Sequence, residues 1–374
     1  MFRSRACSRP RDRRQQFAIA LALVSVVMAA LIVATAALAR DDKPPQDPWT
    51  LYLFRFEFDN DNFLGSDDAF SAGWSFQLHS RLDDTWHPAY ANWIGKFPGL
   101  GDDGKGGRIA RWAVGLGQVI LTPEDISIEA FQPNDVPYAG VLSIAESWSA
   151  YDNRRMGALQ LLIGCMGPCS GAESVQKFIH EDLGLGEPPQ GWDNQLAEKW
   201  LGNANYEYRY KIVADEPGEY APGKFAQDFS VGGQVGLGNL ATFVQGQFEY
   251  RFGWGVPMGF TKAPDPLGLG IMLDPVYFDP TVPLPNLKPW RMYFTVVGRA
   301  ARFDRLAPVD GGETVNGLEH PGFDTYPTSK QVLLGLHLSQ VPWAFHLTYY
   351  RYFDTRNDVD SMSDWINLSF EYRF

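Results

Sequence analysis

Hydrophobic and polar residues alternate with a period of two along much of the chain after residue 50. From Tyr52 to Asp59 an aromatic residue occupies every second position, and Arg55, Glu57 and Asp59 fill most of the positions between them. Since successive side chains of a strand point to opposite faces, this segment predicts a strand with one apolar and one charged face. A soluble sandwich would rarely bury so many charges. The pattern therefore favours a transmembrane barrel, with lipid outside and a polar lumen inside.

Twelve segments show this alternation, and single-chain outer-membrane barrels require such an even number. The segments span residues 50–59, 69–80, 111–122, 139–151, 156–164, 203–215, 227–237, 240–252, 290–303, 325–338, 342–353 and 364–374. The last one ends on an aromatic residue, Phe374, which resembles the assembly signal of bacterial outer-membrane proteins. The sequence thus predicts an all-β fold: a transmembrane antiparallel β-barrel of about 12 strands, inserted by the barrel-assembly machinery.

The connections between these segments differ strongly in length. Residues 238–239 and 339–341 form tight turns, whereas 81–110, 254–289 and 304–324 are long and rich in Pro, Gly and Asp. Outer-membrane barrels usually have short turns on one side and long loops on the other. We expect the same division here.

The first 39 residues have the pattern of a signal peptide. Several arginines precede an apolar stretch from Phe17 to Val33, and small residues up to Ala39 precede Arg40. We expect cleavage after Ala39, with an uncleaved anchor as the alternative because the stretch is long enough to span a bilayer. The mature chain, residues 40–374, has no second apolar run of that length, so we expect a single outer-membrane barrel domain.

Charge and cysteine content narrow the partners and the compartment. A formal net charge of -12 argues against nucleic acid as a partner, because binding to phosphates needs an excess of Lys and Arg. Cys7 lies in the expected signal peptide, and Cys165 and Cys169 are four residues apart. In an oxidising compartment such a pair favours a local disulfide. A metal site is the alternative, although no His or other Cys stands nearby at ligand spacing.

Candidate chemistry concentrates in two places. The run Asp59-Asn60-Asp61-Asn62 resembles half of a calcium loop, but it lacks the glycine and the further oxygen donor of an EF-hand. In residues 171–184 apolar side chains recur at helical spacing, which predicts one short helix within a loop. Gln176 and His180 stand one turn apart on that helix and share a face. Taken alone, the first cluster is typical of a solvated hairpin end, and a single histidine is typical of a lumen or loop residue.

Nine short motifs occur in an order and spacing that match one known family. They are Asp59-Asn60-Asp61, Phe70-Ser71-Ala72-Gly73, Leu116-Gly117-Gln118, Thr122-Pro123, Pro137-Tyr138-Ala139-Gly140, Gly167-Pro168, Gln176-x-x-x-His180, Gly191-Trp192-x-x-Gln195 and Gly238-Asn239. Through this ordered set, which covers essentially the whole mature chain, the sequence resembles the lipid A 3'-O-deacylase family. The resemblance implies a twelve-stranded outer-membrane barrel that removes 3'-linked acyl chains from lipid A with the help of Ca²⁺.

The resemblance also assigns roles to five residues. His180 corresponds to the essential histidine of the family and would be the general base that takes a proton from water, with Asp61 either orienting its ring or binding the metal. Asn60 and Asp61 match its essential Asn-Asp pair, and Ser71 stands where the family usually has Thr. Gln176 matches a site glutamine and would position the histidine or the substrate. Oxygens of Asp61, Asn60 and Ser71 would bind Ca²⁺, and a Ser71 nucleophile is the alternative arrangement.

One departure from the family concerns basic residues. The family usually carries Arg where Val136 stands, and residues 123–137 contain no Lys or Arg. Either Arg108 or Arg111 substitutes for the family's missing basic residue at position 136, or the hydrolytic activity is weakened.

These inferences combine into one prediction. We expect a monomeric, Ca²⁺-dependent lipid A deacylase of the outer membrane, with lipopolysaccharide as substrate and the bilayer as its surroundings. An outer-membrane phospholipase with similar machinery is one alternative. A catalytically inactive barrel that serves as a pore or structural protein is another. The enzymatic hypothesis requires the Asn60-Asp61 pair and His180 to converge at one point on the barrel rim.

Overall fold

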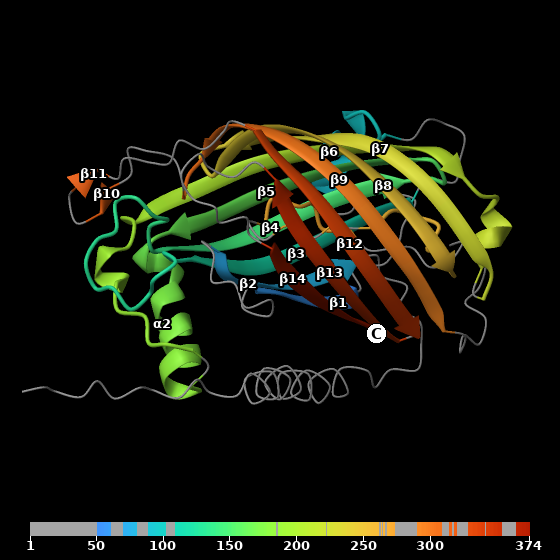
Figure 1. Ribbon diagram of the computed structural model, residues 1–374. Helices are drawn as coiled ribbons and strands as arrows, with labels where there is room; N and C mark the ends of the chain where they lie inside the picture. Colours follow the sequence, from blue (N-terminus) through green and yellow to red (C-terminus); the bar gives the residue numbers. More distant parts are fainter. Residues whose placement is uncertain are drawn as a thin grey trace, which may run out of the picture.

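The computed structural model describes residues 51–60, 70–80, 89–101, 109–184, 186–221, 223–261, 263, 265, 268–273, 290–308, 314–315, 318–319, 328–340, 342–353 and 364–374. Twelve antiparallel strands form one closed barrel (Figure 1). They are β1 (Leu51–Asn60), β2 (Phe70–Ser80), β3 (Ile109–Leu121), β4 (Ala139–Tyr151), β5 (Arg155–Met166), β6 (Lys199–Ala214), β7 (Phe225–Gly238), β8 (Ala241–Trp254), β9 (Arg291–Leu306), β12 (Thr328–Gln340), β13 (Trp343–Phe353) and β14 (Asp364–Arg373). A separate hairpin of β10 (Thr314–Val315) and β11 (Leu318–Glu319) lies between β9 and β12 in the sequence.

The barrel closes where the first strand pairs with the last. The register of β1 and β14 runs from Leu53 opposite Arg373 to Asn60 opposite Ile366. Closure leaves no unpaired strand edge, which a structure surrounded by lipid needs because lipid offers no hydrogen-bond partners. The predicted fold class and strand number are therefore confirmed. The predicted short helix is present as α2 (Ala172–Lys177), which continues into a π-helical turn, Phe178–Asp182. Among the described helices, none has the length and apolar character needed to cross a membrane.

The two faces of the barrel wall follow the predicted alternation. Arg55 and Glu57 are 3% and 5% exposed and point into the lumen. Arg55 donates to Glu371 of β14 from its Nε, 2.9 Å away. Apolar residues such as Ile163 and Trp200 are 68% and 73% exposed and face outward. Charged groups are thus paired inside the barrel, and apolar side chains are left for contact with lipid.

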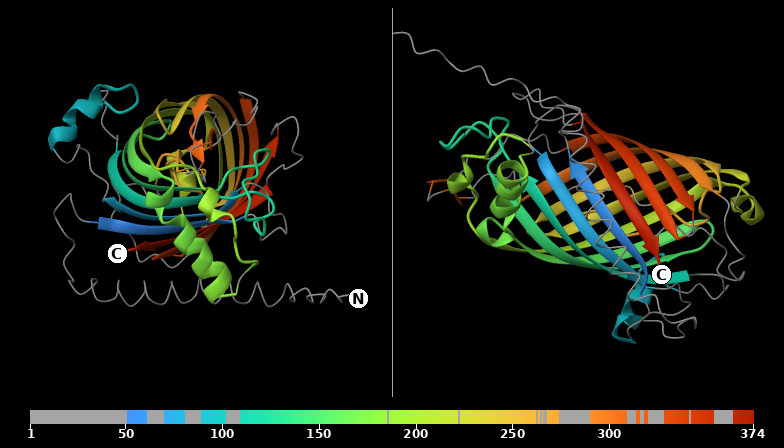
Figure 2. Two further views of the ribbon diagram at one scale, coloured as in Figure 1. Left: turned by 90° about the vertical axis from the view of Figure 1, so that its left-hand side faces the viewer. Right: turned by 90° about the horizontal axis from the view of Figure 1, so that it is seen from below.

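Long and short connections are not divided between the two ends as we predicted. The chain enters β1 and leaves β14 at one end, and α2 lies at the opposite end (Figure 2). The tight turn after Gly238 is at the α2 end, whereas the tight turn after Gln340 is at the end of the termini. The long connection 255–290 is also at the end of the termini. The prediction was wrong because the described residues at the start of this connection lie in the lumen and not in a solvent-exposed loop.

The described residues between 255 and 273 fold back into the lumen, and we call them the plug. Its backbone carbonyls accept hydrogen bonds from lumen-facing side chains of the wall: Lys211 donates to Met258, Arg209 to Thr261 at 2.9 Å, and Arg251 to Gly259 at 2.6 Å. Backbone carbonyls in this position satisfy the buried cations of the wall. The polar lumen and the Gly/Pro-rich connection therefore fit each other.

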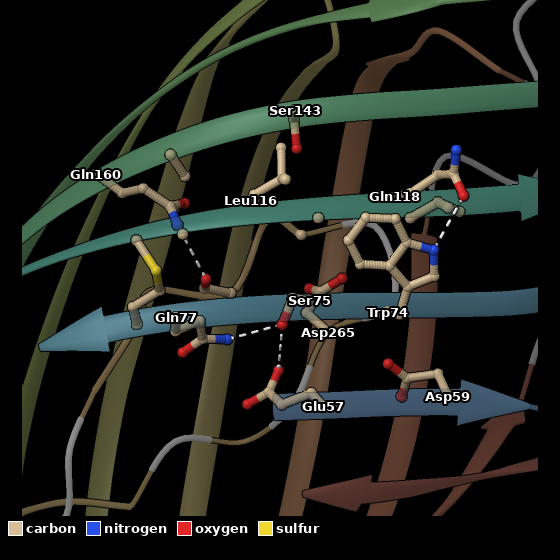
Figure 3. A pocket seen from close by; sticks show the side chains of 17 residues that line it. Glu57, Asp59, Trp74, Ser75, Gln77, Leu116, Gln118, Ser143, Gln160 and Asp265 are labelled. Atoms are coloured by element: carbon tan, nitrogen blue, oxygen red, sulfur yellow. Dashed lines mark hydrogen bonds between the residues drawn. The ribbon is translucent and has the colours of Figure 1, made fainter. Parts of the chain in front are cut away.

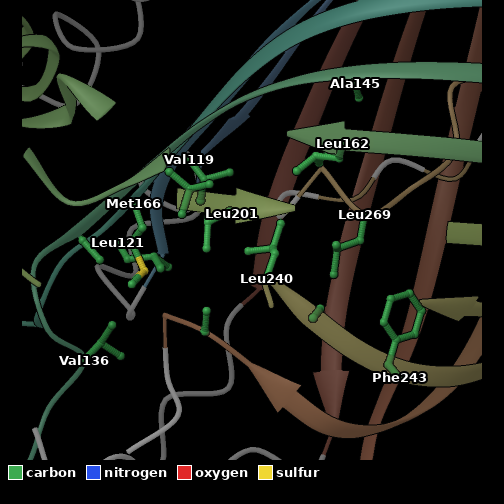
Figure 4. Packing of buried hydrophobic residues seen from close by; sticks show 14 of the residues in the cluster. Val119, Leu121, Val136, Ala145, Leu162, Met166, Leu201, Leu240, Phe243 and Leu269 are labelled. Carbon is green, nitrogen blue, oxygen red and sulfur yellow. The ribbon is translucent and has the colours of Figure 1, made fainter. Parts of the chain in front are cut away.

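An apolar cluster covers the plug at the α2 end of the lumen (Figure 4). Inward side chains from the strand ends, including Leu121, Met166 and Leu201, are at most 7% exposed and pack in one cluster with Val136 of the 122–138 loop and Leu269 of the plug. The described part of the lumen is thus filled by side chains and plug backbone.

Candidate functional site

The helix α2 packs on the outer face of the barrel wall, at the end away from the termini (Figures 1 and 2). A Cβ atom added to Gly140 of β4 would lie 2.1 Å from Ser170 Oγ and 2.3 Å from Ala172 Cβ. Only a glycine at this position allows the helix to lie so near the strand. The disulfide between Cys165, at the end of β5, and Cys169 holds the start of the same segment. The predicted disulfide is confirmed.

The strand register brings Asn60 to the same wall and the same end as α2. Asn60 lies opposite Ala72 of β2, Ala72 opposite Ile120 of β3, and Ile120 opposite Gly140 of β4. All four belong to the outward-facing row, and Ile120 is buried beneath the helix in a cluster with Ala172. The helix covers β3 and β4, and since adjacent strands lie about 4.8 Å apart, Asn60 is roughly 10 Å from β3 and roughly 14 Å from β4.

A chain of hydrogen bonds connects β2 to the helix start across this outer face. The indole Nε1 of Trp74 donates to Gln118 Oε1 at 2.9 Å, and Gln118 Nε2 donates to the carbonyl of Ser170 at 2.7 Å. Gln118 is only 3% exposed although it stands in the lipid-facing row of β3. A polar side chain there is stable because both ends of its amide are bonded.

Gln176 lies beneath the tryptophan of the loop that follows the helix. The indole Nε1 of Trp192 donates to Gln176 Oε1 at 2.7 Å, and both side chains are buried. The amide Nε2 of Gln176 has no hydrogen-bond partner among the described residues. The hydrogen bond of Gln176 is therefore with Trp192, and its amide NH2 group is left as a donor for a ligand.

His180 is held in one orientation by the backbone of its own loop. Its Nδ1 lies 2.6 Å from the carbonyl oxygen of Glu187, and its ring packs against Gly186. Because a carbonyl can only accept, Nδ1 carries the proton in this contact. In the neutral ring, Nε2 then keeps its lone pair. The half-buried imidazole is thus oriented to accept a proton at Nε2.

The remaining predicted site residues are only partly described. Asp61 lies outside the described residues, as does the side chain of Ser71. No group of three or more His, Cys, Asp or Glu side chains at metal-binding distance occurs among the described residues. The donor types expected for Ca²⁺, a carboxylate, an amide and a hydroxyl, suit a hard cation, and of these the structure places Asn60 at the end of β1.

Arg111 does not replace the missing basic residue of the 123–137 loop. It stands at the start of β3, 3% exposed, near Tyr52 at the end of the barrel that carries the termini. Arg108 lies outside the described residues. The sequence suggested Arg111 because the two positions are close along the chain, but the length of β3 separates it from α2.

A polar cavity lies in the same wall, on its lumen side (Figure 3). It is lined mainly by inward residues of β1 to β5 and by Asp265 and Met272 of the plug, and the outward-row residues Trp74, Leu116 and Gln118 also contribute to its lining. Within it Gln77 Nε2 donates to Ser75 Oγ at 2.9 Å, and Ser75 Oγ donates to Glu57 Oε2 at 3.4 Å. Because the barrel wall separates this cavity from lipid, the outer face at α2 is the better candidate for a site that acts on a membrane lipid.

Sequence reasoning missed the residues that position the site. Trp74 and Gln118 are neighbours only through strand pairing, and Trp192 meets Gln176 only once the loop has folded. Two signals were available: Gln118 is a polar residue in the apolar register of β3, and both Gln118 and Trp192 stand in motifs shared with the family, although no role was assigned to them.

The chain was compared with known families and structures. A family model described as "Outer membrane protein LpxR" matches residues 21–374. LpxR from Salmonella typhimurium superposes with a TM-score of 0.64 at 15% sequence identity, covering 86% of this chain and 100% of its own. The β domain of the Bordetella autotransporter BrkA gives a TM-score of 0.41 at 9% identity, covering 87% of this chain and 99% of its own. No curated protein matches the sequence. At 15% identity the structural likeness to the Salmonella protein supports the fold alone.

Proposed function

Because the chain belongs to the LpxR family of outer membrane proteins, we propose that it is a lipid A deacylase that hydrolyses the 3'-linked acyl ester of lipid A. The observation that carries the proposal is the orientation of His180. Its Nδ1 is bonded to the Glu187 carbonyl, so Nε2 is the basic atom, and the residue lies on a segment packed against the outer wall. A lipid in the outer leaflet reaches this wall directly.

His180 would activate the attacking water. Ester hydrolysis needs a base to take a proton from the water as it attacks the carbonyl carbon, and the leaving alkoxide needs a proton afterwards. The Nε2 atom of His180 would accept the first proton and return it to the sugar oxygen. The Glu187 carbonyl stabilises the imidazolium formed between these steps, because it accepts the Nδ1 proton throughout.

The negative charge that develops on the ester oxygen needs a donor or a cation. The unpartnered Nε2 of Gln176 is a neutral donor of the right type. Asp61, Asn60 and Ser71 would hold Ca²⁺, which when bound would polarise the ester carbonyl. Asp61 is then used as a metal ligand, since the ring of His180 already has its orienting partner in Glu187.

The test is the acylation state of lipid A in cells that express the protein. The wild type should remove the 3'-linked chain, which mass spectrometry of extracted lipid A detects, and a chelator should suppress the loss. His180→Ala should abolish it. Ser174→Ala, at an exposed position of the same helix, is the matched control and should behave as the wild type. Identical 3'-acylation with the wild type and His180→Ala would refute the assignment.

Two alternatives remain to be compared in the same assay. A phospholipase would release fatty acid from glycerophospholipid instead, so the purified protein is given both substrates with Ca²⁺. A passive pore finds no support in the described lumen, because the plug and the apolar cluster fill it.

A further inference from the structure

The two loops around α2 form a strongly acidic surface. Residues 122–138 and 167–198 together contain ten Asp and Glu residues and one basic residue, Lys177. We call these ten residues the acidic rim: Glu124, Asp125, Glu129, Asp135, Glu173, Glu181, Asp182, Glu187, Asp193 and Glu198. Eight of them are exposed, and Asp135 and Glu173 are half-buried.

The two loops are joined into one structure, so their charges act together. The backbone N–H of Gln190 donates to the Ile126 carbonyl at 2.8 Å, and Asn194 Nδ2 donates to the Glu129 carbonyl at 2.6 Å. Trp192 packs against Tyr138, with ring centroids 5.0 Å apart. The acidic rim is therefore a fixed surface beside Gln176 and His180.

The negative charge of the rim is almost uncompensated. Lys177 Nζ and Glu173 Oε1, 2.6 Å apart, form the one ion pair of the rim among the described residues. The hydrogen bond that Lys177 donates to Glu173 raises the pKa of Lys177, and the nearby carboxylates of Glu181 and Asp193 act in the same direction. Carboxylates grouped on one surface set up a negative potential that repels anions over about one Debye length, roughly 10 Å at moderate salt.

Apart from Lys177, the hydrogen-bond donors that these loops offer to a ligand are neutral. Gln176, 3% exposed, offers an amide N–H that has no partner among the described residues. Val136 is buried in the apolar cluster. The next basic residue along the chain, Lys199, stands opposite Met166 in the inward register of β6, while its neighbour Trp200 faces outward. Apart from Lys177, which is already paired with Glu173, a phosphate bound beside the helix would thus meet carboxylates and no described basic residue of these loops.

Building on the proposed function, we propose that the substrate is a glycolipid whose head group beside the cleaved ester carries no uncompensated phosphate. Its phosphates are either absent or substituted with amines. A phosphate monoester carries a charge of about -1.5 to -2 at neutral pH, so the acidic rim opposes its approach. An amine-substituted or phosphate-free sugar avoids this repulsion and can still accept the hydrogen bond of Gln176.

Binding to lipids that differ only in phosphate tests the proposal. The His180→Ala protein, which should bind without turnover, is titrated in neutral detergent micelles at fixed Ca²⁺. The probes are bis-phosphorylated lipid A, the same lipid after phosphate removal, and an amine-capped form. We expect the phosphate-free and amine-capped lipids to bind at least tenfold more tightly at low salt. The ratio of these affinities to that of bis-phosphorylated lipid A should fall towards one at high NaCl, because salt screens the repulsion between the acidic rim and the phosphates.

A variant with neutralised carboxylates tests whether the acidic rim causes the preference for lipids without free phosphate. We expect the triple variant Glu124→Gln, Glu129→Gln, Glu181→Gln to bind the phosphate-free and amine-capped lipids only a few-fold more tightly than the bis-phosphorylated lipid. Glu216→Gln with Glu219→Gln, at exposed positions of the opposite barrel end, should leave the preference unchanged. Equal or tighter binding of the phosphorylated lipid at low salt overturns the proposal, as does a preference that survives neutralisation of the rim. If the wild type hydrolyses none of the lipids while the binding preference holds, the proposed function fails and the selectivity stands.

Discussion

At the scale of single residues, the site depends on how the His180 ring is held. The ring contacts the Glu187 carbonyl on one side and the backbone of Gly186 on another. Gly186 has a φ of +142°, which side chains other than glycine rarely adopt, and it leaves room for the imidazole. The catalytic orientation is thus set by one loop of about six residues rather than by a distant partner.

Gly186→Ala should lower the hydrolysis rate at least tenfold. An added Cβ would lie 2.7 Å from His180 Nδ1, so the ring must leave the Glu187 carbonyl. The measurement is the initial rate of fatty acid release by purified protein. Gly171→Ala is the control, since Gly171 also has a positive φ, +68°, but no atom lies within 4 Å of its added Cβ. Equal losses in both variants would mean that backbone strain, rather than ring displacement, causes the effect.

At the scale of elements, the contact between α2 and the barrel wall places the helix. Gly140 allows the close approach, the Cys165–Cys169 disulfide fixes the chain before the helix, and Gln118 bonds Ser170 in the turn that precedes it. These contacts fall on the outward face of β3 and β4, where lipid would otherwise lie. The helix therefore replaces lipid on a small part of the wall.

Gly140→Ala should displace α2 and reduce activity strongly while the barrel remains folded. The methyl group would overlap Ser170 and Ala172, and overpacking of this kind typically costs about 1–3 kcal/mol. The measurements are lipid A mass spectra and the rate of proteolytic cleavage within residues 167–198. Gly246→Ala in β8, where an added Cβ meets open space, should change neither. Full activity in Gly140→Ala would show that the helix position does not matter for catalysis.

At the scale of the whole molecule, the plug decides whether the barrel conducts. A twelve-stranded barrel is wider than the eight-stranded ones that side chains alone fill. Here Arg209, Lys211 and Arg251 bind carbonyls of residues 258–261, and Gln234 Nε2 donates to the Leu269 carbonyl at 2.6 Å. The plug is thus bonded to several strands at once.

The wild-type protein should give no stable open channel in planar bilayers. A variant in which a short Gly-Ser linker replaces residues 256–289 should give discrete conductance steps, because the lumen is then lined by hydrated polar side chains. Heat-dependent migration on gels confirms that the variant is a folded barrel before it is measured. Steady conductance by the wild type would contradict the filled lumen and revive the hypothesis of a pore.

Most of the architecture could be predicted from the sequence because it is encoded locally. Alternation of residues such as Phe56, Glu57 and Phe58 fixes the strand and the face that meets lipid, and it does so in each strand independently. The helical spacing of Ala172 and Val175 likewise predicted the helix. For the candidate site, the sequence indicated His180 and Gln176, but not the partners that hold them.

The positions of the connections between strands were decided only by the tertiary structure, because these segments have no periodic pattern of hydrophobic residues from which their positions could be predicted. The sequence predicted residues 254–289 as an outer loop because they are rich in Pro and Gly, yet residues 255–273 enter the lumen, where buried cations need their carbonyls. Two hydrogen bonds of the site join segments that are distant in the sequence. Trp74 meets Gln118 through strand pairing, and Trp192 meets Gln176 through the folding of the loop. Such contacts depend on the whole closed barrel, because a local pattern specifies the face of a side chain but not the atom that it meets.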